Sequence, residues 1–459
     1  MENLLTNKKA YITLIILCLI HFVSFFDRII ISFIFVPIQS EFQVTDTQLG
    51  LLAGPAFAIT YMLSSIPLGY CVDRFNRVAI ILAGLIAWSA MTLLSGFAVT
   101  FAMLVLCRAA VGIGEAVLMP SASSIINDSF DSEARPFAFG LFFTAAASSI
   151  LVSFVFGSAI VYWLSQHEMF DLPVIGPIQS WRSVLLVSAA VGLVLAPIAY
   201  MLMREPARSS DSAKRGNGSG GGLAYLRANW RVVLAIVAGA PLLNSGLYTF
   251  INWMAVFFQR VHDWPPTRAG LMFGLICGVA AIIGSVTTGF LPRYLRKKGI
   301  RSAYPITCLI IGVGVNALGA LAMLAANPWL AIALLAGAFT GMMSVSVLAM
   351  SMIGEIVPSR FRGTFTGLLI VGSGVLTNAA GPLIAGHLSD SLFVGPTGIS
   401  SALAVVWLVA LVLGGGLLAL GLPRYNALLR QPQMPAVSND DGSSLQWQPQ
   451  TIFAPGESK

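Results

Sequence analysis

Two charged residues lie seven positions apart inside one long apolar stretch of the chain. Arg108 and Glu115 fall within residues 101–126, a run long enough to cross a bilayer. A charge at bilayer depth costs at least about 2.5–3.5 kcal/mol, so a charged pair there needs a reason. Seven residues make nearly two helical turns, and both side chains therefore leave the same face of a helix. The spacing predicts a functional site of charged residues within a membrane.

Asp27 and Arg28 form a second charged pair, within the apolar residues 11–35. Asp27 lies about sixteen residues along this run, or ~24 Å from its start at about 1.5 Å per residue. Arg108 lies about seven residues, or ~10 Å, into a run of opposite direction, so the two depths agree in a core of about 30 Å. We therefore hypothesise an ion pair between Asp27 and Arg108, with Glu115 two turns further in. Arg28 points about 100° away and either reaches the headgroups or meets a substrate anion.

Composition places the chain among the polytopic membrane proteins. Of its 459 residues, 57% are hydrophobic and 10% charged, against about 25% charged in a soluble domain. The apolar runs are continuous rather than alternating, which indicates helices and not a transmembrane barrel. The fold class we expect is an all-α membrane protein with twelve transmembrane helices in two pseudo-symmetric six-helix bundles. The expected spans are 11–35, 47–69, 78–100, 101–126, 137–163, 182–203, 231–258, 269–291, 303–325, 328–350, 363–386 and 400–421.

The distribution of basic residues predicts how the chain crosses the bilayer. With the N-terminus inside, the alternate loops and both tails hold most of the 26 Lys and Arg, which places both termini in the cytoplasm of an inner (plasma) membrane protein. This bias explains an isoelectric point of about 9.3 without any nucleic acid. The five cysteines and four histidines are scattered, so no disulfide framework, metal site or cofactor is indicated.

The chain divides into two halves. Residues 204–230 are rich in Gly and Ser and predict a flexible cytoplasmic linker. It joins an N-terminal six-helix bundle, residues 1–203, to a C-terminal six-helix bundle, residues 231–421. The polar residues 422–459 predict a disordered cytoplasmic tail.

The halves also repeat each other. After the fourth span of each half, an acidic residue is followed by an Arg seven positions later and a Gly five after that. The two sets are Asp128, Arg135 and Gly140, and Glu355, Arg362 and Gly367. Internal repeats of this kind are typical of secondary transporters, whose substrate site lies at the interface of the halves.

The segment Gly69–Arg77, G-Y-C-V-D-R-F-N-R, fits the inner-loop signature G-x-x-x-D-R-x-G-R of the major facilitator superfamily. We expect a charge latch in which Asp73 accepts from Arg135 or from the start of the fifth span, while Arg74 and Arg77 lie at the headgroups. Ordinary positive-inside flanking would explain the arginines but not the acid. The latch residues we expect are Gly69, Asp73, Arg74, Arg77, Asp128, Arg135, Glu355 and Arg362.

Over most of residues 24–265 the chain resembles the spinster-like subfamily of that superfamily, in its bacterial type. The matching residues are Asp27-Arg28, residues 68–77, and Arg108 to Ala116 with Pro120 and Asp128. The resemblance implies cation-coupled movement, in the first place proton-coupled, of amphiphilic anions such as lysolipids and sphingoid phosphates. Sugar-acid symporters of the same superfamily share a similar D-R and G-x-x-E pairing, so small organic or sugar-acid anions stay open as substrates.

Charge and burial suggest a role for each residue. An acid alone in a cavity of low dielectric favours its protonated form, so Glu115 is the better proton carrier and Asp27 the partner of Arg108 in the empty site. Arg108 would then hold the anionic group of the substrate. The alternative is that all four charges form one static buried network. The proton-coupling residues we expect are Glu115 and Asp27, and the substrate-binding residues are Arg108, Arg28, Asn244, Tyr248, Asn252, Trp253 and Asn378; the polar stripe of the seventh span fits helix packing equally well.

We therefore predict a secondary active transporter that works by alternating access, and not an enzyme. A lipid-modifying membrane enzyme would need a nucleophile or a metal cluster near the surface, and none is visible in the sequence. A non-transporting sensor would have lost its membrane charges, and these are intact. The partners we expect are an anionic small-molecule or lipid-like substrate, protons and the lipid bilayer, with no nucleic acid, and the chain is expected to be a monomer.

Overall fold

The computed structural model describes residues 2–131, 134–167, 169–172, 176–207, 219–341, 344–358, 361–395 and 397–430. Twelve helical segments in this part of the chain are long and apolar enough to cross a membrane. They coincide, to within a few residues at most ends, with the twelve predicted spans. The predicted all-α fold class is confirmed, and the chain is a multi-pass membrane protein.

Nine helices and one hairpin build the described part of the N-terminal half. They are α1 (Glu2–Phe33), α2 (Phe35–Phe42), α3 (Asp46–Ala53), α4 (Pro55–Arg74), α5 (Arg77–Gly96), α6 (Phe101–Glu115), α7 (Leu118–Ser129), α8 (Arg135–Gln166), β1 (Met169–Leu172), β2 (Gly176–Gln179) and α9 (Ser180–Leu202). β1 and β2 pair antiparallel, with Met169 opposite Gln179. Two of the breaks are followed by a proline. Pro37 cannot donate to the carbonyl of Phe33, the last residue of α1, and Pro120 cannot donate to that of Ala116, the residue after α6.

The C-terminal half repeats this plan with three π-helical segments. Its elements are α10 (Ser219–Ala228), α11 (Trp230–Leu234), η2 (Ala235–Gly239), α12 (Ala240–His262), α13 (Pro266–Thr287), α14 (Phe290–Lys297), α15 (Ala303–Met323), α16 (Pro328–Phe339), α17 (Ser344–Ile356), α18 (Arg362–Gly372), η4 (Ser373–Ala380), α19 (Gly381–Ser391), α20 (Gly398–Val409), η5 (Ala410–Gly414) and α21 (Gly415–Arg430). α10 lies within the predicted linker, and α21 extends beyond the predicted end of the last span. The rest of the linker, 208–218, and the tail, 431–459, lie outside the described residues.

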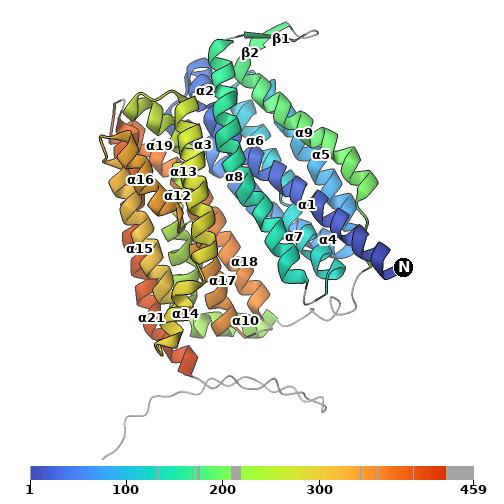
Figure 1. Cartoon of the computed structure of the whole chain (residues 1–459), viewed down its shortest axis with the longest axis vertical. Helices are drawn as coiled ribbons and strands as arrows, with labels where there is room; N and C mark the ends of the chain where they lie inside the picture. Colours follow the sequence, from blue (N-terminus) through green and yellow to red (C-terminus); the bar gives the residue numbers. More distant parts are fainter. Residues whose placement is uncertain are drawn as a thin grey trace, which may run out of the picture.

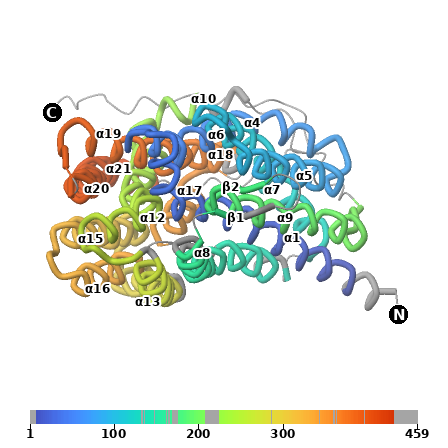
Figure 2. The backbone as a smooth tube through the Cα atoms, turned by 90° about the horizontal axis from the view of Figure 1, so that it is seen from above, coloured from blue at the N-terminus to red at the C-terminus, as the bar shows by residue number. Residues whose placement is uncertain are grey.

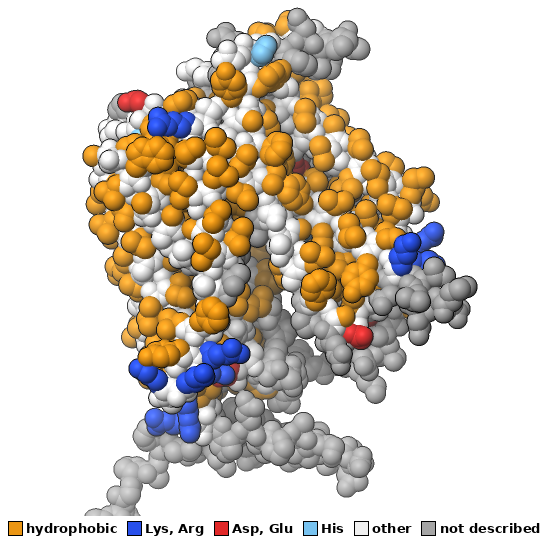
Figure 3. All heavy atoms as spheres, in the orientation of Figure 1, with side chains coloured by type: hydrophobic (Ala, Val, Ile, Leu, Met, Phe, Trp, Pro, Cys, Tyr) orange, Lys and Arg blue, Asp and Glu red, His pale blue; other side chains and the backbone are white. Residues whose placement is uncertain are grey.

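The two halves stand side by side and diverge toward one end of the molecule (Figures 1 and 2). We call the end that carries β1 and β2 the hairpin end, and the opposite end, with α10 and α14, the basic end. The halves meet where α3 packs on α19 and α8 on α13. A space-filling view shows the two lobes separating toward the basic end (Figure 3).

The apolar core has the same division. One cluster contains residues of both halves, among them Phe33, Phe154, Phe250 and Phe273. The other two clusters each belong to one half. The residues that α1 gives to the shared cluster, 29–33, lie nearer the hairpin end than those it gives to the N-terminal cluster, 14–23. The halves therefore share a core at the hairpin end and have separate cores at the basic end.

Glycines allow the close approach of α13 to α8. Gly270, Gly274 and Gly278 repeat every fourth residue, which places them on one helix face. A Cβ atom at Gly274 would lie 2.7 Å from the Cβ of Phe154, and one at Gly278 would lie 2.7 Å from a methyl of Leu151. Small residues at this spacing are the usual solution for tight helix contacts in membranes.

Candidate functional site

Arg28 and Glu115 form an ion pair within the N-terminal half. Arg28 extends from α1, and Glu115 is the last residue of α6. The Nη2 atom of Arg28 lies 2.6 Å from Oε2 of Glu115, and its Nε atom donates to the same oxygen at 2.7 Å. Ser24, one helical turn before Arg28, donates to this oxygen at 2.6 Å. The side chain of Glu115 is fully buried, whereas that of Arg28 is 25% exposed.

Arg108 and Asp27 lie together, as the depth argument predicts, but they do not form the predicted ion pair. The guanidinium of Arg108 donates to the backbone carbonyls of Asp27, at 3.3 Å, and of Arg28, at 3.1 Å. The Asp27 carboxylate leaves α1 in another direction and accepts from the hydroxyl of Ser188 on α9. Sequence spacing predicted the correct depth and the wrong partner, because Nη1 and Nη2 of Arg108 donate to the main chain of α1, while its buried Nε has no hydrogen-bond partner.

Asp27 is also a buried acid of this site, but it forms no ion pair with any of the described residues. It is 2% exposed, and its Oδ2 atom has no hydrogen-bond partner. Burial of an unpaired carboxylate is costly, and the neutral acid avoids that cost. The two acids of the site therefore differ: Glu115 has a cationic partner and Asp27 has a hydroxyl.

Aromatic rings surround the guanidinium of Arg28. Its Cζ atom lies 4.9 Å from the ring centre of Phe25, 4.5 Å from that of Phe57 and 5.0 Å from that of Tyr61. The helix that carries Arg28, α1, packs on α12 of the other half. Arg28 thus lies at the interface of the two halves and is partly accessible. Arg108 is only 5% exposed and is therefore not accessible.

The polar residues predicted to bind substrate in the C-terminal half have mixed surroundings. Asn244 is buried and donates to Ser346 on α17 at 3.1 Å. Asn252 donates to the carbonyl of Tyr248 at 2.9 Å, within its own helix. Asn378 is exposed in η4 and donates to the carbonyl of Ser373. Only Asn378 among these three is open to solvent.

Trp253 does not line a cavity. Its side chain is fully buried, and its Nε1 atom donates to the carbonyl of Pro382 at 3.2 Å. Its ring contacts Phe35 of the other half at a centroid distance of 5.8 Å. That Trp253 binds substrate stays a prediction: in this conformation its face of α12 is covered at the hairpin end.

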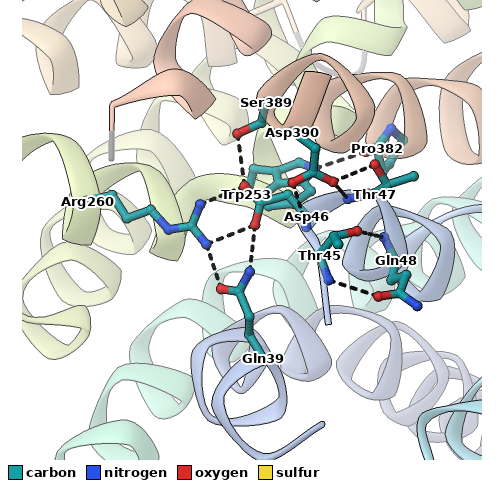
Figure 4. A network of polar contacts seen from close by, with 10 residues as sticks. All are labelled: Gln39, Thr45, Asp46, Thr47, Gln48, Trp253, Arg260, Pro382, Ser389 and Asp390. Atoms are coloured by element: carbon teal, nitrogen blue, oxygen red, sulfur yellow. Dashed lines mark hydrogen bonds and ion pairs between the residues drawn. The ribbon is translucent and has the colours of Figure 1, made fainter. Parts of the chain in front are cut away.

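A polar network connects the two halves at the hairpin end (Figure 4). The carboxylate of Asp46 accepts from Arg260 on α12 at 2.6 and 2.9 Å, and from Gln39 on α2 at 2.9 Å. Arg260 also donates to the side-chain oxygen of Gln39, and Ser389 on α19 donates to Asp46. One buried acid of the N-terminal half is thus held by two elements of the C-terminal half.

Asp390 on α19 binds the start of α3 across the same interface (Figure 4). It accepts from the backbone N–H of Asp46 at 3.1 Å and of Thr47 at 2.6 Å, and from the Thr47 hydroxyl at 2.6 Å. A carboxylate at a helix N-terminus is favourable because the first N–H groups have no partner within the helix. Asp390 therefore caps a helix of the opposite half.

At the basic end, Arg77 is buried between three segments of the N-terminal half. It pairs with Asp128 of α7 and with Glu205, whose Oε1 lies 2.7 Å from Nε, and it donates to the carbonyl of Pro206 at 2.7 Å. Its side chain is 1% exposed, so the prediction that it lies at the headgroups is wrong. Arg74 is exposed and lies over the ring of Tyr70, as the prediction requires.

The C-terminal half has a corresponding contact. Arg296 of α14 pairs with Glu355 of α17 at 2.5 Å, and the Tyr425 hydroxyl donates to the other oxygen of Glu355. Nearby, Tyr225 donates to the carbonyl of Ile356, and burial raises the pKa of Tyr225 to about 12, which keeps it a donor. Asp128 and Glu355, which the repeat relates to each other, thus each pair with an arginine of their own half, although the sequence did not predict these partners.

The remaining residues of the predicted latch are Gly69, Asp73, Arg135 and Arg362. The side chains of Arg135 and Arg362 lie outside the described residues, so the contact of Asp73 with Arg135 stays a prediction. At Gly69 there is open space where a side chain would be.

A family model described as Major Facilitator Superfamily matches residues 17–368 of the chain. The chain belongs to the Major Facilitator Superfamily. Within the superfamily it is a spinster-like transporter, as its sequence resemblance predicted. A solved bacterial homologue of the human lysosomal transporter spinster, inward-facing and unoccupied, is 25% identical with a TM-score of 0.75, and the match covers 92% of this chain and 97% of that one.

Two curated relatives of this superfamily member differ in what their names say they carry. A D-galactonate transporter of Escherichia coli is 24% identical over 88% of this chain and 94% of its own length. The sphingosine-1-phosphate transporter SPNS2 of Danio rerio is 26% identical over 80% of this chain and 74% of its own length.

Sequence reasoning about this transporter found the membrane charges and missed the network at the hairpin end. Asp46, Arg260 and Asp390 lie at the ends of predicted spans, where charges are unremarkable. A signal was present nonetheless: Asp46 directly follows Thr45, whose side chain and that of Gln48 form a capping box. This marked a helix start that could accept a carboxylate, but not the helix that supplies it.

Proposed function

We propose that this transporter moves amphiphilic organic anions, of the lysolipid or sphingoid-phosphate kind, coupled to protons and by alternating access. The family supports transport, and the ion pair of Arg28 with Glu115 is the single observation that carries the rest. A partly exposed arginine at the interface of the halves is a binding group for an anion. Its present partner is a buried acid that an incoming anion would have to replace.

The coupling follows from this replacement. When the substrate anion binds Arg28, Glu115 loses its cationic partner in a buried position, and it takes up a proton because an unpaired buried charge is costly. Binding of the anion and binding of a proton then favour each other, and this coupling is reciprocal. Asp27 provides a second proton site, since it is buried without an ion pair. Arg108 takes a supporting role in place of the predicted substrate-binding role, because it is buried and its Nη1 and Nη2 atoms donate to the backbone of α1.

The rings near Arg28 favour an amphiphile. Phe25, Phe57 and Tyr61 present apolar surface next to the guanidinium, which suits an anion that carries a hydrocarbon chain. No acidic or basic residue occurs at mid-depth in the C-terminal spans to bind the hydroxyl groups of a sugar. The relative named as a sphingosine-1-phosphate transporter is consistent with this choice.

A small sugar acid is the second candidate. The relative named as a D-galactonate transporter covers more of this chain, and its name also specifies an anion. Asn378, exposed in η4, and Tyr248 near Arg28 are polar groups that could meet hydroxyls.

The arrangement of the two halves supports an inward-facing state. The basic end carries α14 and the first turns of α1, and by the positive-inside rule we place it and both termini in the cytoplasm of the inner membrane. The halves are closed at the hairpin end by Asp46, Arg260 and Asp390 and diverge at the basic end (Figures 1 and 4). The network at the hairpin end then acts as the outer gate, which must break to face the other side.

The experiment is uptake by purified protein in liposomes with an imposed pH gradient. We expect gradient-driven movement of fluorescent lysophosphatidate and of taurocholate, and none of D-galactonate. Movement of D-galactonate alone would show that the substrate is a sugar acid and not an amphiphile. Movement of the amphiphiles at equal rates with and without the pH gradient would contradict the proposed coupling to protons.

A further inference from the structure

We infer that α14 and the turn after it bind the headgroups of anionic phospholipids in the leaflet at the basic end. The inference rests on the proposed orientation only for the identity of that leaflet. The segment 290–302 reads F-L-P-R-Y-L-R-K-K-G-I-R-S, with five basic residues and no acid. A cluster of Lys and Arg is visible at this end of the molecule (Figure 3).

The faces of α14 divide by chemistry. Pro292 is buried, and Leu291 and Leu295 are half-buried against the protein. Phe290 and Tyr294, four residues apart, are 62% and 52% exposed. An exposed aromatic pair at the end of a membrane span is typical of the headgroup level, where amphipathic rings are most stable.

The basic residues flank this aromatic pair. Arg293 and Lys297 are also four residues apart and exposed, so they leave one face of the helix together. The ammonium of Lys298 lies 4.8 Å from the ring centre of Tyr294. Arg301 is exposed in the turn that follows. Rings and cations thus form one surface that combines apolar insertion with positive charge.

This positive charge is only partly neutralised by the protein. Among the described residues, the ion pair of this segment is the one between Arg296 and Glu355. An anionic phosphate is the complement of the other cations, and a phosphate joined to acyl chains also satisfies the exposed rings. The corresponding loop of the N-terminal half carries the exposed rings of Tyr70 and Phe75, but Arg74 is its exposed arginine and Arg77 is buried. The segment 290–302 therefore presents more positive charge beside its rings than that loop does.

The surface is also connected to the moving parts. Through Arg296 it contacts Glu355 at the end of α17, and through Glu355 it contacts Tyr425 of α21. A lipid bound on α14 would hold the basic end of three spans of the C-terminal half against one leaflet while the N-terminal half moves.

The test is lipid binding by the full chain in detergent, measured by native mass spectrometry with phosphatidylglycerol and phosphatidylcholine. The variant is Lys297→Gln with Lys298→Gln. The matched control is Lys8→Gln with Lys9→Gln, which removes the same two charges from exposed lysines near the start of α1. We expect the wild type to prefer phosphatidylglycerol, the first variant to bind it about tenfold more weakly, and the control to bind it as the wild type does.

Equal binding by the first variant and the wild type would overturn the inference, as would an equal loss in both variants. Displacement of phosphatidylglycerol by millimolar inorganic phosphate would also overturn it, because the site would then recognise free phosphate and not a lipid. An unchanged melting temperature verifies that each variant is folded. Because no transport is measured, failure here leaves the proposed substrate intact, and failure of the uptake assay leaves the lipid site intact.

Discussion

Arg28 and Glu115 come from helices of the same half, and Nη2 of one lies 2.6 Å from Oε2 of the other. The pair is asymmetric, because the acid is fully buried and the arginine is partly open toward the other half. An anion can therefore reach the arginine, while the acid depends on it. In the proposed mechanism, this asymmetry lets the pair switch between an empty and an occupied site.

Arg28→Gln should weaken anion binding by about 10–100-fold, because truncating one member of a desolvated charge pair costs about 2 kcal/mol or more. Arg268→Gln is the matched control, since Arg268 is an exposed arginine that stacks on Trp264 away from the site. Binding of taurocholate to both variants is measured by titration calorimetry. Equal affinity of the Arg28 variant and the wild type would show that another cation holds the substrate.

Asp27→Asn should leave the fold intact and abolish uphill transport. Asparagine has the same shape and still accepts from Ser188, and no ion pair is lost in this conformation. We expect the melting temperature to stay within about 2 °C of wild type, while a pH gradient no longer drives accumulation. If Asp27 were instead an ionised structural partner, the melting temperature would fall strongly.

Arg260→Gln should open the hairpin end. The change removes the charged partner of Asp46, and a loss of about 2 kcal/mol shifts the conformational equilibrium roughly 30-fold. Opening is measured as the reactivity of Leu49→Cys, a position buried in α3, toward a membrane-impermeant maleimide in a background without native cysteines. The same label in an Arg268→Gln protein serves as control. Unchanged reactivity would mean that apolar contacts alone keep this end closed.

Arg77→Gln should destabilise the protein and Arg74→Gln should not. Arg77 is buried with two acids that would be left unpaired, and breaking a buried ion pair costs about 3–5 kcal/mol. We expect the melting temperature to fall by about 5 °C or more for Arg77 and to change little for the exposed Arg74. Similar behaviour of the two variants would contradict the burial of Arg77.

Much of the fold follows from the sequence, because span length and hydropathy depend on local composition. The twelve spans and the relation of Asp128 to Glu355 were predicted from patterns of this kind. The partners of the membrane charges were not. Adjacent residues such as Asp27 and Arg28 diverge by about 100°, and which neighbour each one meets depends on the packing of α6 and α9 around α1.

The hairpin-end network could not be predicted for a related reason. Its members come from α2, α3, α12 and α19, and the hydrogen bond between Asp46 and Asp390 joins residues that are 344 positions apart along the chain. Their pairing depends on contact between the two halves, so no property of one segment indicates it.

The measurement that tests the central claim most directly is the pH dependence of anion binding to wild type and to Glu115→Gln. Taurocholate is a suitable probe because its sulfonate stays charged between pH 5.5 and 8. In the wild type, binding of the anion to Arg28 is proposed to be coupled to binding of a proton, so affinity should rise as pH falls, by up to about tenfold per unit. In the variant, affinity should depend on pH much less than in the wild type, with Asp27 as the remaining proton site, and should be at least as high as that of wild type at pH 5.5. A wild type with flat or opposite pH dependence, or a variant that no longer binds, would contradict the competition of Glu115 with substrate for Arg28.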